Sequence, residues 1–141
     1  MARAHNPYGS QIRASDSIDR ERERERRIMV QACYKHAPEL SLKLVQRLLD
    51  KKIIETTSEQ ALRTTFEKLF SKISDLEEFE MQFKIAPIRT LAANPNVISL
   101  YITQYIIEDL IENPVVQDVF GDDLEIYNAV NSVLGKFRPK N

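Results

Sequence analysis

Residues 97–111, VISLYITQYIIEDLI, are the most apolar stretch of the chain. Isoleucine, leucine, valine and tyrosine recur here at helical spacing and cover most of the circumference of the helix that they predict. A helix that is apolar on nearly every side usually lies in the centre of a core or is buried at an interface. Asn94-Pro95-Asn96 precedes the stretch, and we interpret these residues as the start of the helix.

Helices are also predicted on both sides of this stretch, because apolar residues recur there at helical spacing. Pro38 ends the first of these helices and suits the first turn of the second. Thr56 with Glu59, and Asp122 with Glu125, fit the capping box that begins many helices. The predicted helices cover residues 17–36, 40–50, 58–74, 115–120 and 124–137.

Residues 76–86 give an ambiguous pattern. Apolar and polar residues alternate strictly over 79–85, and a period of two is the signal of a strand. The internal partner for such a strand is the short stretch 53–56, while a symmetric copy in a dimer and an extended segment lying over the helices are the alternatives. The expected fold is therefore mainly α, a compact bundle of five to six helices with a short β element near 53–56 and 78–86.

The composition is that of an ordinary globular domain. A chain of 141 residues fits one domain, and 43% hydrophobic and 29% charged residues are close to average usage. These values exclude a wholly disordered chain, a collagen, a disulfide scaffold and a strongly basic nucleic-acid binder. We expect a single helical domain over residues 17–138, a flexible N-terminal arm over 1–16 and a frayed tail over 139–141.

Further classes are excluded by what the sequence lacks. Cys33 is the only cysteine, so no intrachain disulfide forms and nothing indicates an oxidising compartment. Three glycines are too few for a Gly-rich phosphate-binding loop. No apolar run has the length of a signal peptide or reaches the roughly 20 residues that span a bilayer. We expect a soluble cytoplasmic protein that does not contact a membrane.

Charge is distributed unevenly along the chain, although the formal net charge is only −1. No lysine or arginine occurs between Arg89 and Lys136, and this interval carries seven acidic residues. Residues 1–89 and 136–141 each carry a net charge of +3. The acidic interval should repel phosphate backbones and attract a basic surface of the same chain or of a second copy. Alternatively, these acids only keep an apolar half of the chain in solution.

Two groups of residues suggest catalytic or metal sites. Cys33 and His36 are three residues apart and share a helix face, which suits a nucleophile with its base or two metal ligands. A small buried cysteine beside a helix-terminal histidine is the alternative that we favour. The acids from Glu108 to Asp123 suit Mg²⁺, but they match no calcium loop and have no histidine nearby. We therefore expect no enzymatic activity, no metal and no cofactor.

These observations favour a non-enzymatic interaction or regulatory protein that acts through protein–protein contacts and associates with itself. The nearly all-apolar helix, the unpaired strand-like segment and the split charge support this hypothesis. Within 20–27 the acids alternate with the arginines, so we expect a solvated helix or interhelical ion pairs. The candidate contact residues are Glu108, Asp109, Glu112, Asp118, Asp122, Asp123, Arg22, Arg24, Arg26 and Arg27.

A nucleic-acid-associated regulator is the alternative. Residues 28–50 fit a helix-turn-helix pattern with Pro38 in the turn. The second helix carries side chains of types that reach base edges and phosphates, namely Ser41, Lys43, Gln46 and Arg47. The candidate nucleic-acid-binding residues are Lys43, Arg47, Lys51 and Lys52. An enzyme of unrecognised type, built on either residue group above, is the remaining hypothesis.

Overall fold

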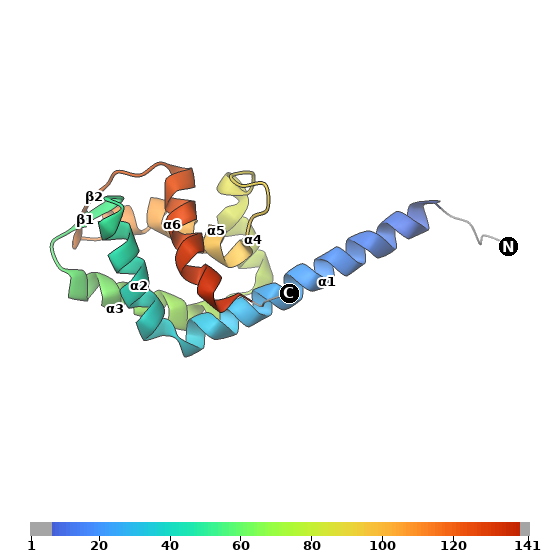
Figure 1. Cartoon of the computed structure of the whole chain (residues 1–141), viewed down its shortest axis with the longest axis horizontal. Coiled ribbons are helices and arrows are strands. Elements are labelled where there is room, and N and C mark those ends of the chain that lie inside the picture. Colours follow the sequence, from blue (N-terminus) through green and yellow to red (C-terminus); the bar gives the residue numbers. More distant parts are fainter. Residues whose placement is uncertain (1–6, 139–141) are drawn as a thin grey trace.

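A computed structural model gives the fold of the chain. It describes the backbone of residues 7–138 and the side chains of residues 20–138. Within these residues six α-helices and a two-stranded antiparallel sheet confirm the prediction of a mainly α protein with a small β element (Figure 1). The elements are α1 (Pro7–Lys35), α2 (Ala37–Asp50), β1 (Ile54–Thr56), α3 (Glu59–Lys72), α4 (Glu78–Ile85), α5 (Val97–Glu108), β2 (Val116–Val119) and α6 (Asp123–Leu134).

α5 lies in the core, as its apolar sequence predicts. It packs against α1, α4 and α6. Asn96 begins this helix by accepting a hydrogen bond from the backbone N–H of Ser99 at 2.9 Å. The buried Thr103 hydroxyl donates to the carbonyl of Ser99 at 2.7 Å, whereas the buried Oε1 of Gln104 has no hydrogen-bond partner among the described residues. The buried residues of α5 are Ile98, Ser99, Leu100, Ile102, Thr103, Gln104 and Ile106.

α2 and α3 supply another part of the same core. Leu40, Leu44 and Leu48 recur at i,i+4 along α2 and are at most 1% exposed. α3 packs against this helix and contributes Phe66 and Phe70, whose ring centroids lie 6.4 Å apart. Burial of each such side chain contributes about 1.5–3 kcal/mol relative to an exposed position. The amphipathic patterns of both helices therefore reflect real core faces.

β1 pairs with β2, and not with the segment 78–86 that the sequence offered as its partner. Ile54 lies opposite Val119 in this antiparallel pair. The prediction of a β element near 53–56 is confirmed, but the identity of its partner strand was wrong.

The short helix predicted over 115–120 is also wrong, because these residues contain β2. The side-chain oxygen of Asn113 accepts a hydrogen bond from the backbone N–H of Val115 at 3.0 Å. Such an Asn-Pro turn carries the same sequence signal as a helix N-cap. The β-branched valines that follow then favour the strand.

Residues 78–86 do not form a strand, since they contain α4 and the start of the 3₁₀ turn that follows it. The alternation that predicts a strand contains two i,i+4 pairs, which a helix places on different faces. Met81 and Ile85 form the buried pair, at most 1% exposed. Phe79 and Phe83 form the other pair and point into solvent, 76% and 75% exposed. Residues 79–85 are so few that their pattern fits both the two-residue period of a strand and the 3.6-residue period of a helix.

The helix caps agree with the sequence at one of the two predicted capping boxes. The box predicted at Thr56 is wrong, because Ser58 caps α3 by accepting from the backbone N–H of Ala61 at 3.2 Å. The box predicted at Asp122 is confirmed: Asp122 and Glu125 each accept the backbone N–H of the other.

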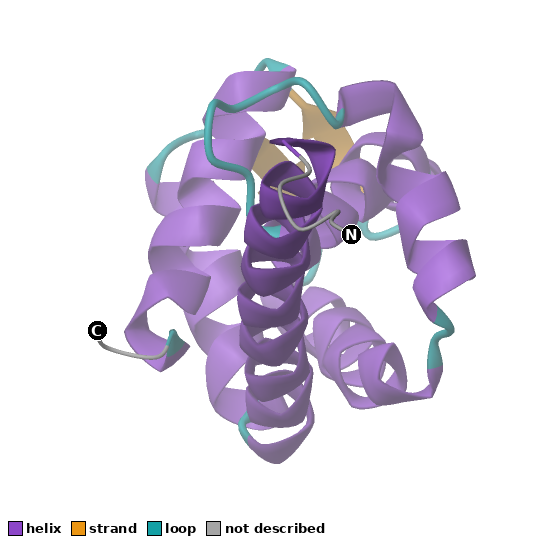
Figure 2. Cartoon of the chain, turned by 90° about the vertical axis from the view of Figure 1, so that its right-hand side faces the viewer, coloured by secondary structure: helices purple, strands orange, loops and turns teal. Residues whose placement is uncertain are grey.

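α1 begins at Pro7, ten residues before the predicted start at Ser17. Residues 7–16, which the sequence assigns to a flexible arm, are thus helical. Figure 1 shows that the N-terminal half of α1 extends away from the other helices, and Figure 2 looks along this extension. Residues 1–6 of the predicted arm and 139–141 of the predicted tail lie outside the described residues.

Candidate functional site

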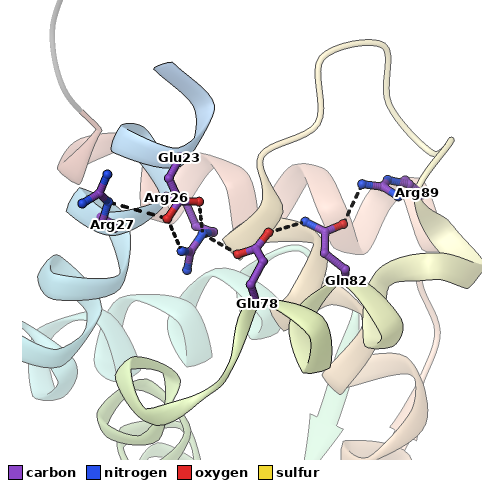
Figure 3. A network of polar contacts seen from close by, with 6 residues as sticks. All are labelled: Glu23, Arg26, Arg27, Glu78, Gln82 and Arg89. Atoms are coloured by element: carbon purple, nitrogen blue, oxygen red, sulfur yellow. Dashed lines mark hydrogen bonds and ion pairs between the residues drawn. The ribbon is translucent and has the colours of Figure 1, made fainter. Parts of the chain in front are cut away.

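A network of charged and polar side chains joins α1 to α4 (Figure 3). Arg26, one of the candidate contact residues, lies between Glu23 on its own helix and Glu78 on α4. Its Nε is 3.1 Å from Glu23 Oε2 and 2.7 Å from Glu78 Oε2. Gln82 donates to Glu78 at 2.9 Å and accepts from Arg89 at 2.6 Å. The expected interhelical pairing of the Arg–Glu run is therefore confirmed at Arg26.

A cleft of about 290 Å³ lies beside this network, between α1, α4 and the start of α5. The hydrogen bond between Glu23 and Arg26 lowers the pKa of Glu23 and raises the pKa of Arg26, so both are charged at neutral pH. Glu25 accepts from the side chain of Asn96 at 3.2 Å and lies 3.8 Å from Arg138 Nε. Glu23, Glu25 and Arg26 thus have partners, and the pair of Arg26 with Glu78 holds α1 to α4.

Of the other candidate arginines, Arg22 lines the cleft and Arg27 belongs to the network, whereas Arg24 does neither. Arg22 and Arg24 are exposed, and Arg27 lies 3.6 Å from Glu23. Among residues 20–138, no ion pair joins the candidate arginines to the acids of residues 90–135. The structure therefore does not bring the two oppositely charged candidate sets together within one molecule.

Two of the six acidic candidates form ion pairs with α4. Lys84 Nζ lies 3.0 Å from both Glu108 Oε2 and Asp109 Oδ2, and its hydrogen bond lowers the pKa of Glu108. Asp122 is occupied as the N-cap of α6. The other three are exposed and lie on three different elements: Glu112, Asp118 and Asp123. In the described part of the chain, no three His, Cys, Asp or Glu residues are grouped to hold a metal ion.

Cys33 and His36 do not form a reactive pair in this structure. Cys33 is fully buried, and burial raises the pKa of its thiol to about 12. The thiol is therefore protonated at neutral pH, whereas a nucleophile needs the thiolate. The ring of His36 packs against Phe137 with a centroid separation of 4.9 Å. Cys33 thus serves the packing of α1, and His36, between α1 and α2, packs against the residues that follow α6.

An exposed aromatic surface on α4 was missed by sequence reasoning. The rings of Phe79 and Phe83 stack on each other with centroids 6.4 Å apart. Leu76 and Tyr101, both half-buried, line a shallow pocket with them. We call these four residues the α4 aromatic surface. The sequence signal for this surface is the apolar i,i+4 pair Phe79 and Phe83. If Met81 and Ile85 face the core, a helix places this second pair on its exposed side.

A groove between α2 and α6 gathers most of the candidate nucleic-acid-binding residues. Lys136, just beyond α6, joins them there. Lys52 does not line this groove but lies in the turn after α2, with a φ of 57°. Ser41 is buried and donates to a backbone carbonyl of its own helix, so it cannot contact a base. The candidates that line this α2–α6 groove are Lys43, Arg47 and Lys51.

Among residues 7–138 no helix is both long enough and apolar enough to span a bilayer. Comparison of the chain with protein-family models, with curated proteins and with solved structures found no match.

Proposed function

We propose that this protein is a non-enzymatic interaction protein that binds a partner protein through the α4 aromatic surface. The observation that supports this proposal is the exposure of two phenylalanines, 76% and 75%, on a helix that buries its other apolar pair. An adaptor or regulatory role in the cytoplasm is part of the proposal, in keeping with a single cysteine that forms no disulfide.

The aromatic rings of Phe79 and Phe83 are not needed for the packing of α4. Burying one such ring against a partner is worth about 1.5–3 kcal/mol, a gain that the isolated molecule forgoes. Aromatic side chains are enriched in the buried centres of protein interfaces. Tyr101, half-buried beside them, adds a ring with a polar end that suits an interface rim. The surface therefore has the composition of a contact centre.

The charges around the surface indicate the chemistry of the partner. Glu80 lines the surface and is exposed, and Asp75 and Glu77 are exposed just before α4. Lys84 is already paired with two carboxylates. A partner segment with apolar side chains flanked by Lys or Arg complements this arrangement, whereas a symmetric second copy would place acids against acids. Self-association, which the sequence predicts, remains a prediction that the same experiment addresses.

Two labelled amphipathic peptides with identical leucines test the proposal, one with lysines and one with glutamates on the polar face. At the α4 aromatic surface, measured as the binding that F79S/F83S removes, we expect the lysine peptide to bind at least about tenfold more tightly, because its charges complement the acids around the surface. The double variant F79S/F83S should lose this binding. Light scattering of the wild-type protein over a range of concentrations would reveal a dimer that competes for the same surface.

The matched control replaces two apolar residues that are exposed elsewhere, Ile111 and Leu124, at 54% and 45%. I111S/L124S should bind the lysine peptide like the wild type. Binding of the lysine peptide that survives F79S/F83S, or an equal loss in I111S/L124S, would contradict the proposal. A concentration-dependent dimer that F79S/F83S abolishes would instead assign the surface to self-association.

A further inference from the structure

The α2–α6 groove consists of two adjoining depressions. One, of about 400 Å³, includes Lys43 and Lys136 in its lining. The other, of about 340 Å³, includes Glu125. Arg47 and Lys51 line both depressions, so the two form one continuous groove along antiparallel helices. The end of the groove near Lys136 is therefore the basic end.

Most of the positive charge in the groove is not neutralised within the protein. Lys43 has a partner, since its Nζ lies 2.8 Å from Glu39 Oε1. Among the described residues no carboxylate forms an ion pair with Arg47, Lys51 or Lys136. Cations gathered in one depression repel one another, and an anionic ligand relieves that repulsion. The groove therefore favours an anionic occupant.

One acid, Asp50, also lines the basic depression, where it stands against four cations. The carboxylate of Asp50 accepts a hydrogen bond from the side-chain amide of Gln46 at 2.8 Å, one turn back along α2. Below the charged rim, Val133 and Ala129 of α6 are buried and form an apolar part of the lining. A ligand that fits this groove combines an anionic edge with small apolar groups.

The spacing of the cations indicates the shape of that ligand. Lys43, Arg47 and Lys51 follow one another at i,i+4, which places them in steps of about 6 Å along the helix axis. Carboxylates at i and i+4 on a second helix repeat at the same distance. An acidic helix lying along the groove would therefore meet one cation per turn, with Lys136 facing it from the other wall.

Nucleic acid fits the groove less well. Proteins that hold single strands combine cations with aromatic side chains on which the bases stack. The lining of both depressions contains no aromatic residue. α6 also packs along the side of α2 that carries these cations, so this side of α2 is not free to enter a major groove.

We propose that the α2–α6 groove binds an acidic helical segment of a partner protein, whose carboxylates pair with Arg47, Lys51 and Lys136. This site is separate in its residues and opposite in its charge from the α4 aromatic surface. A protein with both sites can hold two partners of different chemistry at once. The groove can fail its test while the aromatic surface passes, and the reverse.

The test uses a labelled alanine-based peptide with glutamate at every fourth position, the same peptide with glutamine instead, and a single-stranded oligonucleotide. Fluorescence anisotropy with the full chain measures the binding of each. We expect the glutamate peptide to bind at least about tenfold more tightly than the glutamine peptide and than the oligonucleotide. Its affinity should fall as salt is raised, because the contacts lie at a solvated rim.

The variant R47Q/K51Q should weaken binding of the glutamate peptide by about tenfold. The control is K68Q/K72Q, which removes two exposed lysines with the same i,i+4 spacing on α3 and should leave the affinity within about twofold. Equal losses in both variants would show general charge attraction and overturn the proposal. Tighter binding of the oligonucleotide, lost in R47Q/K51Q, would assign the groove to nucleic acid and overturn it as well.

Discussion

α5 and α4 are neighbouring helices that differ in how much of their apolar surface is buried. α5 buries apolar side chains on several sides and lies in the core. α4 packs against it, buries Met81 and Ile85, and leaves Phe79 and Phe83 in solvent. In α5 the apolar sequence serves stability. On the outer face of α4 the apolar side chains stay exposed and do not contribute to the core. Exposed apolar surfaces are typical of contacts with other molecules.

The largest expected effect is on the α5 side of this comparison. Ile102 is fully buried, and Ile102→Ala removes three carbon atoms from a packed core. We expect the free energy of unfolding to fall by about 2–5 kcal/mol, measured by urea denaturation. Ile111→Ala, at a position 54% exposed just after α5, is the control and should change it by less than about 0.5 kcal/mol. Similar losses in both would mean that α5 is not the centre of the core.

A smaller effect is expected where α4 is held to α1. Glu78→Gln removes a carboxylate 2.7 Å from Arg26 Nε, and the Arg26 side chain is only 15% exposed. Because this guanidinium keeps Glu23 as a partner, we expect a loss of about 1 kcal/mol in the free energy of unfolding. Glu80→Gln, an exposed acid on the same helix, should have almost no effect. Equal effects would show that the network contributes nothing specific.

The same contrast explains how much the sequence predicts. α5 was predicted correctly because a long apolar run with an Asn cap leaves few alternatives. α4 was not, because a helix and a strand fit residues 79–85 equally well, and the choice is made by the pocket that receives Met81 and Ile85. That pocket is formed by residues distant in sequence. Local propensity alone contains no information about it.

The candidate sites show the same limit. For residues 20–27 the sequence predicts a solvated helix or interhelical ion pairs, but the partner of Arg26, Glu78, lies in the segment for which a strand was expected. The sequence also places Lys43, Arg47 and Lys51 on one helix face, yet Lys136 joins them only because α6 folds back along α2. Spacing along one helix is readable from sequence, while the opposite wall of a groove depends on tertiary packing.

Acid should weaken the charged contacts within α1 and between α4 and α5 before it disturbs the apolar core. The hydrogen bonds to Arg26 and Lys84 lower the pKa values of Glu23 and Glu108 below the ordinary 4.5. A lowered pKa in the folded state adds stability above about 4.5, and this stability is lost as the pH falls through the folded-state values. Urea midpoints should therefore decline below that pH, and less steeply in E23Q/E108Q. Glu112→Gln, an exposed acid without an ion pair among the described residues, should keep the wild-type slope.

The smallest effect is expected on the outer face of α4. Since Phe79 and Phe83 are 76% and 75% exposed, F79S/F83S removes little buried area, and the loss of their mutual stacking costs a few tenths of a kcal/mol. We expect the free energy of unfolding to change by less than about 0.5 kcal/mol in urea denaturation. A variant that is as stable as the wild type yet no longer binds the lysine peptide would show that Phe79 and Phe83 serve binding, whereas the apolar residues of α5 serve stability. A loss of 2 kcal/mol or so, of the size expected for a core position, would mean that these rings belong to the core and that the comparison with α5 fails.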